Sequence, residues 1–69
     1  MDECRVFFND QAGRITHMNI GTFLERKYKF PDAPVYVYFD NGSVLLIPLK
    51  DLRVSKKDVD AFLKNIKKP

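Results

Sequence analysis

The segment 35–48 constrains the fold more than any other part of this chain, because it holds Asn41-Gly42 between two runs rich in β-branched and aromatic residues. This pattern predicts a β-hairpin with a two-residue type I′ turn, since both central residues of that turn need a positive φ. The turn would pair Phe39 with Val44 and Tyr36 with Ile47, and paired residues share one face of the sheet.

Alternation along these two strands predicts one wholly apolar face, which we expect to form the core and which consists of Val35, Val37, Phe39, Val44 and Leu46. The opposite face would carry Tyr36, Tyr38, Leu45 and Ile47. A first hairpin is predicted from a strand over 4–9, a turn over 10–13 and a return strand from Arg14. Its inward residues would be Val6, Phe8 and Ile15, and its outward residues Arg5, Phe7, Thr16 and Met18.

Two helices complete the predicted order. Thr22 and Glu25 fit a capping box at the start of a short helix, and Asn19 is a rival N-cap one turn earlier. Ser55 would cap a second helix. The apolar stripe of that helix consists of Val59, Phe62, Leu63 and Ile66. The predicted fold is therefore α+β, a single domain with a small antiparallel sheet and two helices in the order ββαββα over residues 1–69.

The placement of the helices decides what the tyrosine-bearing face of the sheet does. If both helices cover one face, the other face exposes Phe7, Met18, Tyr36, Tyr38, Leu45 and Ile47, with Arg5 beside them. Exposed apolar patches of several hundred Å² mark interaction sites. In the alternative arrangement one helix packs on each face, and the tyrosines join a second small core.

Positive charge gathers in the last third of the chain. The net charge is +3, and residues 50–69 hold seven Lys and Arg against three Asp and Glu. On the last helix Lys57, Lys64 and Lys68 share an arc opposite the apolar stripe, and Lys50 and Arg53 precede the helix. Such a ridge can contact phosphates, with an affinity that salt weakens. The alternative is an ordinary solvated helix face.

Aromatic residues on the sheet suggest a second way to bind nucleic acid. Tyr36 and Tyr38, with Phe7 on a neighbouring strand, can stack on the bases of a single strand. The glycine-and-aromatic signature of the RNA-recognition module is absent from the sequence. The competing interpretation is that these rings pack within the protein.

The sequence offers little for catalysis. Cys4 and His17 are the only residues of their kinds and fit one face of the first hairpin, but no third group orients them. We expect Cys4 to be a small buried apolar residue. A metal set, a phosphate loop and a dinucleotide motif are all missing from the sequence. We therefore expect no enzymatic activity, no cofactor and no small-molecule substrate.

The lone cysteine excludes an internal disulfide and suits a reducing compartment. The chain begins without a basic segment followed by an apolar one, and its longest apolar runs are five or six residues. A membrane span needs about 20. We expect a cytoplasmic protein that does not enter a membrane.

Together these features predict a small non-catalytic binding or regulatory protein whose partner is nucleic acid. The residues predicted to bind are Arg5, Phe7, Tyr36, Tyr38, Lys50, Arg53, Lys57, Lys64 and Lys68. The alternative is an inhibitor or adaptor of the kind that phage and mobile-element genes encode. Such a protein would bind a host protein, or a second copy of itself, through the apolar sheet face.

Overall fold

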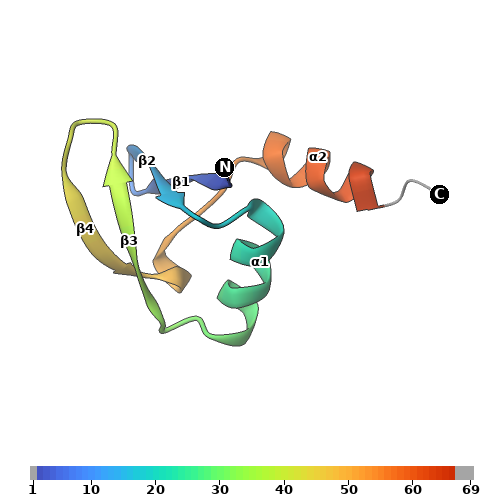
Figure 1. Cartoon of the computed structure of the whole chain (residues 1–69), viewed down its shortest axis with the longest axis horizontal. Helices are drawn as coiled ribbons and strands as arrows, with labels where there is room; N and C mark the ends of the chain where they lie inside the picture. The colour runs from blue at the N-terminus through green and yellow to red at the C-terminus, as the bar shows by residue number, and fades with distance from the viewer. Residues whose placement is uncertain (1, 67–69) are drawn as a thin grey trace.

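The computed structural model describes residues 2–66. Over this range the elements are β1 (Glu3–Phe8), β2 (Gln11–Thr16), α1 (Ile20–Lys29), β3 (Pro34–Phe39), β4 (Val44–Pro48), the 3-10 helix η1 (Leu49–Asp51) and α2 (Lys56–Ile66). The strands form one antiparallel sheet in the order β1-β2-β3-β4 (Figure 1). The predicted α+β class and ββαββα order are confirmed.

The β3–β4 hairpin forms, but its predicted register is wrong by one residue. Tyr38 lies opposite Val44, and Tyr36 lies opposite Leu46. Among the described residues positive φ occurs at Gly42 but not at Asn41, so the bend is not type I′. The N–H of Phe39 donates to the carbonyl of Ser43, which leaves Asp40, Asn41 and Gly42 as a three-residue loop with Gly42 at φ 95°.

The one-residue shift exchanges the faces of β4. Val44 and Leu46, predicted for the core, are 48% and 54% exposed, and Ile47, predicted to face outward, is buried. The faces of β3 are as predicted, with Val37 and Phe39 buried. The run Val-Leu-Leu-Ile is apolar at every position, so alternation in the sequence carries no signal for its register.

The β1–β2 hairpin turns earlier than predicted. Asn9 and Asp10 form its bend, with Asn9 at φ 54°, a left-handed conformation that asparagine tolerates better than most residues. Gly13, predicted in the turn, lies within β2 opposite Phe39. A Cβ added there would meet the Cγ1 of Val37 at 2.8 Å and the carbonyl of Tyr38 at 3.1 Å. Gly13 therefore serves the close approach of β3 to β2.

The core lies between the inner face of the sheet and α1. Its members are Cys4, Val6, Ile15, Met18, Phe23, Val37, Phe39, Ile47, Leu49 and Leu52. Asn19 is the N-cap of α1, since its Oδ1 accepts from the N–H of Thr22 at 2.8 Å, so the rival start is correct and the Thr22 capping box is wrong. Met18, predicted to face outward, is buried because β2 ends at Thr16 and His17 adopts φ 61°, which interrupts the alternation.

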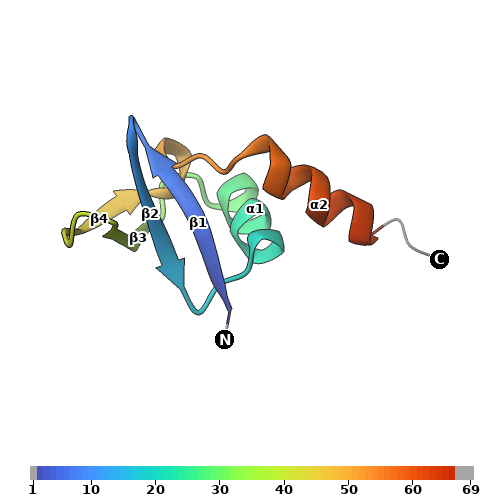
Figure 2. The same ribbon diagram turned by 90° about the horizontal axis from the view of Figure 1, so that it is seen from above.

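The segment after η1 returns to the free edge of β1. Phe7 and Arg53 exchange backbone hydrogen bonds of 2.8 and 2.9 Å. The chain then leads into α2, whose predicted cap is confirmed because the Oγ of Ser55 accepts from the N–H of Asp58. Figures 1 and 2 show α2 extending away from the sheet, beyond α1.

The apolar stripe predicted for α2 is only partly covered. Val59 and Phe62 are half-buried and Leu63 is exposed, and the side chain of Ile66 lies outside the described residues. Phe62 packs over Gly21 of α1, where an added Cβ would lie 2.7 Å from the ring. A glycine in the first turn of α1 thus makes room for α2.

Candidate functional site

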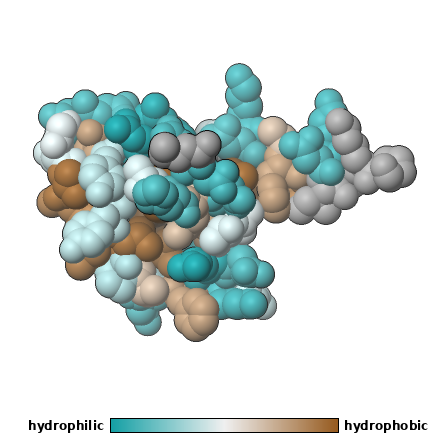
Figure 3. Space-filling model, viewed as in Figure 1, coloured by the Kyte–Doolittle hydropathy of each residue, from teal (hydrophilic) through white to brown (hydrophobic). Residues whose placement is uncertain are grey.

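The surface opposite α1 is open across the whole sheet. We call it the outer face, and its members are Glu3, Arg5, Phe7, Ala12, Arg14, Thr16, Pro34, Tyr36, Tyr38, Val44, Leu46 and Pro48. Tyr36 is 62% exposed and Tyr38 is 39% exposed. Figure 3 shows apolar residues gathered over the β3–β4 end of the molecule. Of the two arrangements left open by the sequence, the one that exposes both tyrosines is therefore observed.

Three residues predicted for the outer face do not lie on it. Met18 and Ile47 belong to the core, and Leu45 lies on the inner side of β4 with Val37 as its partner. Val44 and Leu46 take the places of Leu45 and Ile47 opposite the two tyrosines. Each of these changes follows from the registers described above.

One row of residues crosses all four strands of the described sheet. Arg5 pairs with Arg14, Arg14 with Tyr38, and Tyr38 with Val44. Residues directly opposite on one face have Cβ atoms about 5 Å apart, and like charges in such pairs are destabilising. Arg5 and Arg14 therefore repel each other beside an exposed aromatic ring, and an anionic ligand bound between them would relieve that repulsion.

Asp40 offsets the positive charge of one of the two arginines. The Nη1 of Arg5 lies 2.9 Å from both carboxylate oxygens of Asp40, which follows β3. Arg14 is exposed and forms no ion pair with any residue between 2 and 66. Arg14 thus lies beside Tyr38 without an ion pair among the described residues, and Glu3 is on the same face one pair further along β1.

The predicted binding residues separate into three groups. Arg5, Phe7, Tyr36 and Tyr38 lie on the outer face. Lys57 and Lys64 are exposed on α2, which extends away from β3 and β4 (Figure 1). Lys68 lies outside the described residues. The start of α2 borders β1, since Glu3 and Arg5 line one depression with Asp58 and Phe62, whereas the tyrosines of β3 lie toward the other end of the molecule.

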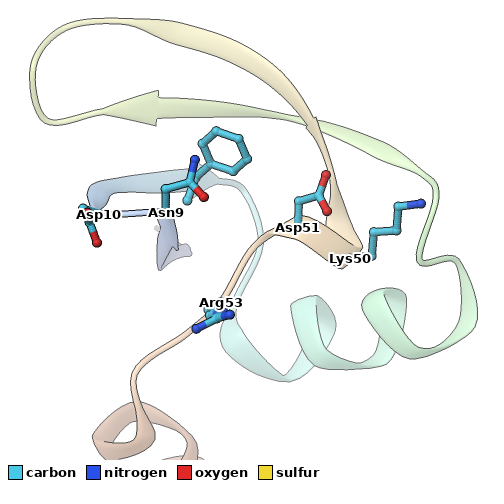
Figure 4. A pocket seen from close by; sticks show the side chains of 6 residues that line it. Asn9, Asp10, Lys50, Asp51 and Arg53 are labelled. Carbon is cyan, nitrogen blue, oxygen red and sulfur yellow. The ribbon is translucent and has the colours of Figure 1, made fainter.

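Lys50 and Arg53 form the third group, beside the β1–β2 bend. They line an open depression of about 600 Å³ together with Phe8, Asn9, Asp10 and Asp51 (Figure 4). The Nζ of Lys50 lies 3.0 Å from a carboxylate oxygen of Asp32, and Figure 4 shows its side chain extending away from Arg53. The hydrogen bond to Asp32 raises the pKa of Lys50. This lysine is engaged within the protein rather than aimed into the depression.

The Cys4–His17 pair considered above does not assemble. Cys4 is buried in the core, and burial first and the charge of Asp58 second raise the pKa of its thiol to about 11. His17 is exposed past the end of β2. Within residues 2–66 no group of three or more His, Cys, Asp or Glu side chains is placed to hold a metal ion.

Arg14 and Asp40 are residues of this surface that sequence reasoning missed. The predicted turn over 10–13 set Arg14 opposite Asn9, whereas the bend at Asn9-Asp10 sets it opposite Arg5. An Asn-Asp pair after Val-Phe-Phe is a turn signal of its own, and it indicates the observed register. Asp40 is adjacent to Asn41-Gly42, and only its contact with Arg5 distinguishes it from an ordinary loop residue.

Neither helix in the described part of the chain is long and apolar enough to cross a membrane. Comparisons of the chain with protein-family models, with curated proteins and with solved structures found no match.

Proposed function

We propose that this chain is a non-catalytic protein that binds single-stranded nucleic acid on its outer face. The observation that carries the proposal is the row in which Arg5 and Arg14 lie side by side next to Tyr38. The free cysteine of the core suits a reducing compartment, so the cytoplasm is the proposed location.

The spacing of the tyrosines suits an extended strand. Tyr36 and Tyr38 are two residues apart on β3 and face the same side, so their Cα atoms are separated by about 6.6 Å. Aromatic rings on an open antiparallel sheet are a platform on which successive bases stack, and every base has a π face that suits them. Each tyrosine would take one base.

The arginines of the outer face would bind the phosphate backbone of the single-stranded nucleic acid. Guanidinium groups bind phosphate with two hydrogen bonds and remain charged at any physiological pH. Arg14 is opposite Tyr38, so a phosphate beside the stacked base falls within its reach. A single strand fits this flat face better than a duplex, whose bases are already stacked on one another.

Fluorescence anisotropy with a labelled ten-nucleotide oligothymidylate tests the proposal. We expect Tyr36→Ala combined with Tyr38→Ala to weaken binding by roughly 30-fold or more, because each stacked base contributes about 1–3 kcal/mol. Tyr28→Ala is the matched control, since Tyr28 is 88% exposed on α1 and remote from the outer face. It should bind as the wild type does.

A second variant separates the outer face from the basic helix. Lys57→Glu combined with Lys64→Glu reverses two charges on α2 without touching the sheet. We expect it to weaken binding less than the double tyrosine variant. If the lysine variant abolishes binding and the tyrosine variant leaves it intact, α2 rather than the outer face is the site. If the chain does not bind the oligonucleotide but binds a protein with an affinity that salt does not weaken, the inhibitor or adaptor alternative is favoured.

A further inference from the structure

The outer edge of β4 is unpaired within residues 2–66. The sheet order ends at β4, and the hydrogen bond from the N–H of Phe39 to the carbonyl of Ser43 fixes which residues bond to β3. In an antiparallel ladder every second residue bonds to the same neighbour. Ser43, Leu45 and Ile47 therefore bond to β3, and the backbone groups of Val44 and Leu46 point to the open edge.

This edge has only one of the usual protections against pairing, the proline at its end. Native edge strands carry charged side chains, bulges or prolines that discourage another strand. Between Val44 and Ile47 every side chain is aliphatic and none is charged. Pro48 ends the strand, and it has no N–H to offer.

The available donors select one register for a strand that pairs with β4. If β4 meets a second copy of itself about a two-fold axis beside Leu45, Val44 lies opposite the partner's Leu46. That register uses both free N–H groups and both free carbonyls of each copy. Moving the axis to Leu46 would place Val44 opposite the partner's Pro48, which has no N–H, so the carbonyl of each Val44 would stay unpaired.

The exposed side chains fit the same arrangement. Val44, Leu45 and Leu46 are each about half exposed, and Tyr36 and Tyr38 flank them. Val44, Leu45 and Leu46 together expose roughly 270 Å² of apolar surface beside the free edge. An interface of this area is below the standard size for a stable complex, so the main-chain hydrogen bonds carry the association and a weak affinity is expected.

We propose that two copies of the chain join their β4 strands antiparallel, with Val44 opposite the partner's Leu46, into one continuous sheet. A second copy suits this edge because it brings the same uncharged aliphatic strand and the same pair of donors. The arrangement leaves the rings of Tyr36 and Tyr38 on the open side of the joined sheet. It stands apart from the proposed nucleic-acid binding, and either one can fail without the other.

Analytical ultracentrifugation from about 10 µM to about 1 mM tests the assembly, a range that covers weak and moderate interfaces. We expect a mass that rises toward twice the 8.1 kDa of one chain. Leu46→Lys should keep the protein monomeric, because it places two like charges beside the axis. Leu63→Lys is the control, since Leu63 is a similarly exposed leucine on α2.

Amide hydrogen exchange of the wild type provides a readout that does not depend on any variant. At high concentration the amides of Val44 and Leu46 should exchange at least about tenfold more slowly than in the dilute protein. The amide of Leu45, bonded to β3, should change little. A monomer at 1 mM would overturn the proposal. So would a dimer in which these two amides stay unprotected, or one that Leu63→Lys dissociates and Leu46→Lys does not.

Discussion

The guanidinium of Arg5 on β1 lies 2.9 Å from both carboxylate oxygens of Asp40, which is 35 residues further along the chain. Both side chains are about half exposed, so the pair contributes only about 0–1 kcal/mol to stability. Its larger consequence is electrostatic. Asp40 places a negative charge on the surface where the proposed ligand needs positive charge.

Asp40→Asn is therefore expected to tighten the binding of a single-stranded oligonucleotide. The substitution frees Arg5 for a phosphate, and one further phosphate contact steepens the slope of log K against log salt by about 0.7. Anisotropy titrations over a series of salt concentrations measure both quantities. Asp32→Asn is the matched control, because it breaks the Lys50 ion pair away from the outer face. Equal or weaker binding by Asp40→Asn would contradict the assignment of Arg5 to the site.

Gly13→Ala is expected to lower the free energy of unfolding by about 1–3 kcal/mol, the usual cost of overpacking. The added methyl meets both a core side chain, Val37, and the backbone carbonyl of Tyr38, which cannot move without disturbing β3. Urea unfolding followed by circular dichroism measures the change. Gly42→Ala serves for comparison, since Gly42 has open space around it and its cost comes from φ 95° alone. A Gly13→Ala protein as stable as the wild type would show that β2 and β3 are further apart than described.

Phe62→Ala is expected to release α2 without unfolding the sheet. No residue of α2 belongs to the core of the described chain, and the ring of Phe62 packs over Gly21 of α1. Amide exchange should accelerate throughout α2 and remain nearly unchanged in Val6 and Val37. Leu63→Ala, which removes an exposed side chain, should change neither region. Equal acceleration in the helix and the sheet would mean that the two unfold together.

The thiol of Cys4 makes stability depend on pH in the alkaline range. Its pKa is raised from 9.0 to about 11 on folding, so the folded state holds the proton more tightly than the unfolded state. The resulting stabilisation is complete below pH 9 and is lost as the pH rises from 9 through 11. The melting temperature of the wild type should therefore fall more steeply over this pH range than that of Cys4→Ala. Parallel pH profiles for the two proteins would show that the thiol is not shielded from water.

The topology was predictable from the sequence because each element carries its own local signal. Asn41-Gly42 and the alternation of β3 indicate the second hairpin, and Ser55 indicates the start of α2. Asn19 competed with Thr22 for the N-cap of α1. The packing of Phe62 on Gly21 favours the longer helix that begins after Asn19. These two residues are 41 positions apart in the sequence, so no local pattern reveals their contact.

The register of β4 was not predictable, because its four aliphatic residues satisfy either face equally well. Asp-Asn-Gly supports a two-residue turn and a three-residue loop alike, since Gly42 adopts the left-handed conformation in both. The choice between them rests on which of Leu46 and Ile47 packs in the core, a tertiary contact. Arg14 escaped notice for a related reason, since its partner depends on where the first hairpin bends.

The rings of the chain's three tyrosines provide the most direct test of the outer face as a binding surface. With ¹³C-labelled tyrosine, two-dimensional NMR resolves each ring as a single oligothymidylate strand is added. Stacking on bases should shift the ring signals of Tyr36 and Tyr38 together, and Tyr28 on α1 should stay where it is. Binding that moves Tyr28, or that leaves Tyr36 and Tyr38 unmoved, would contradict the proposed role of the outer face.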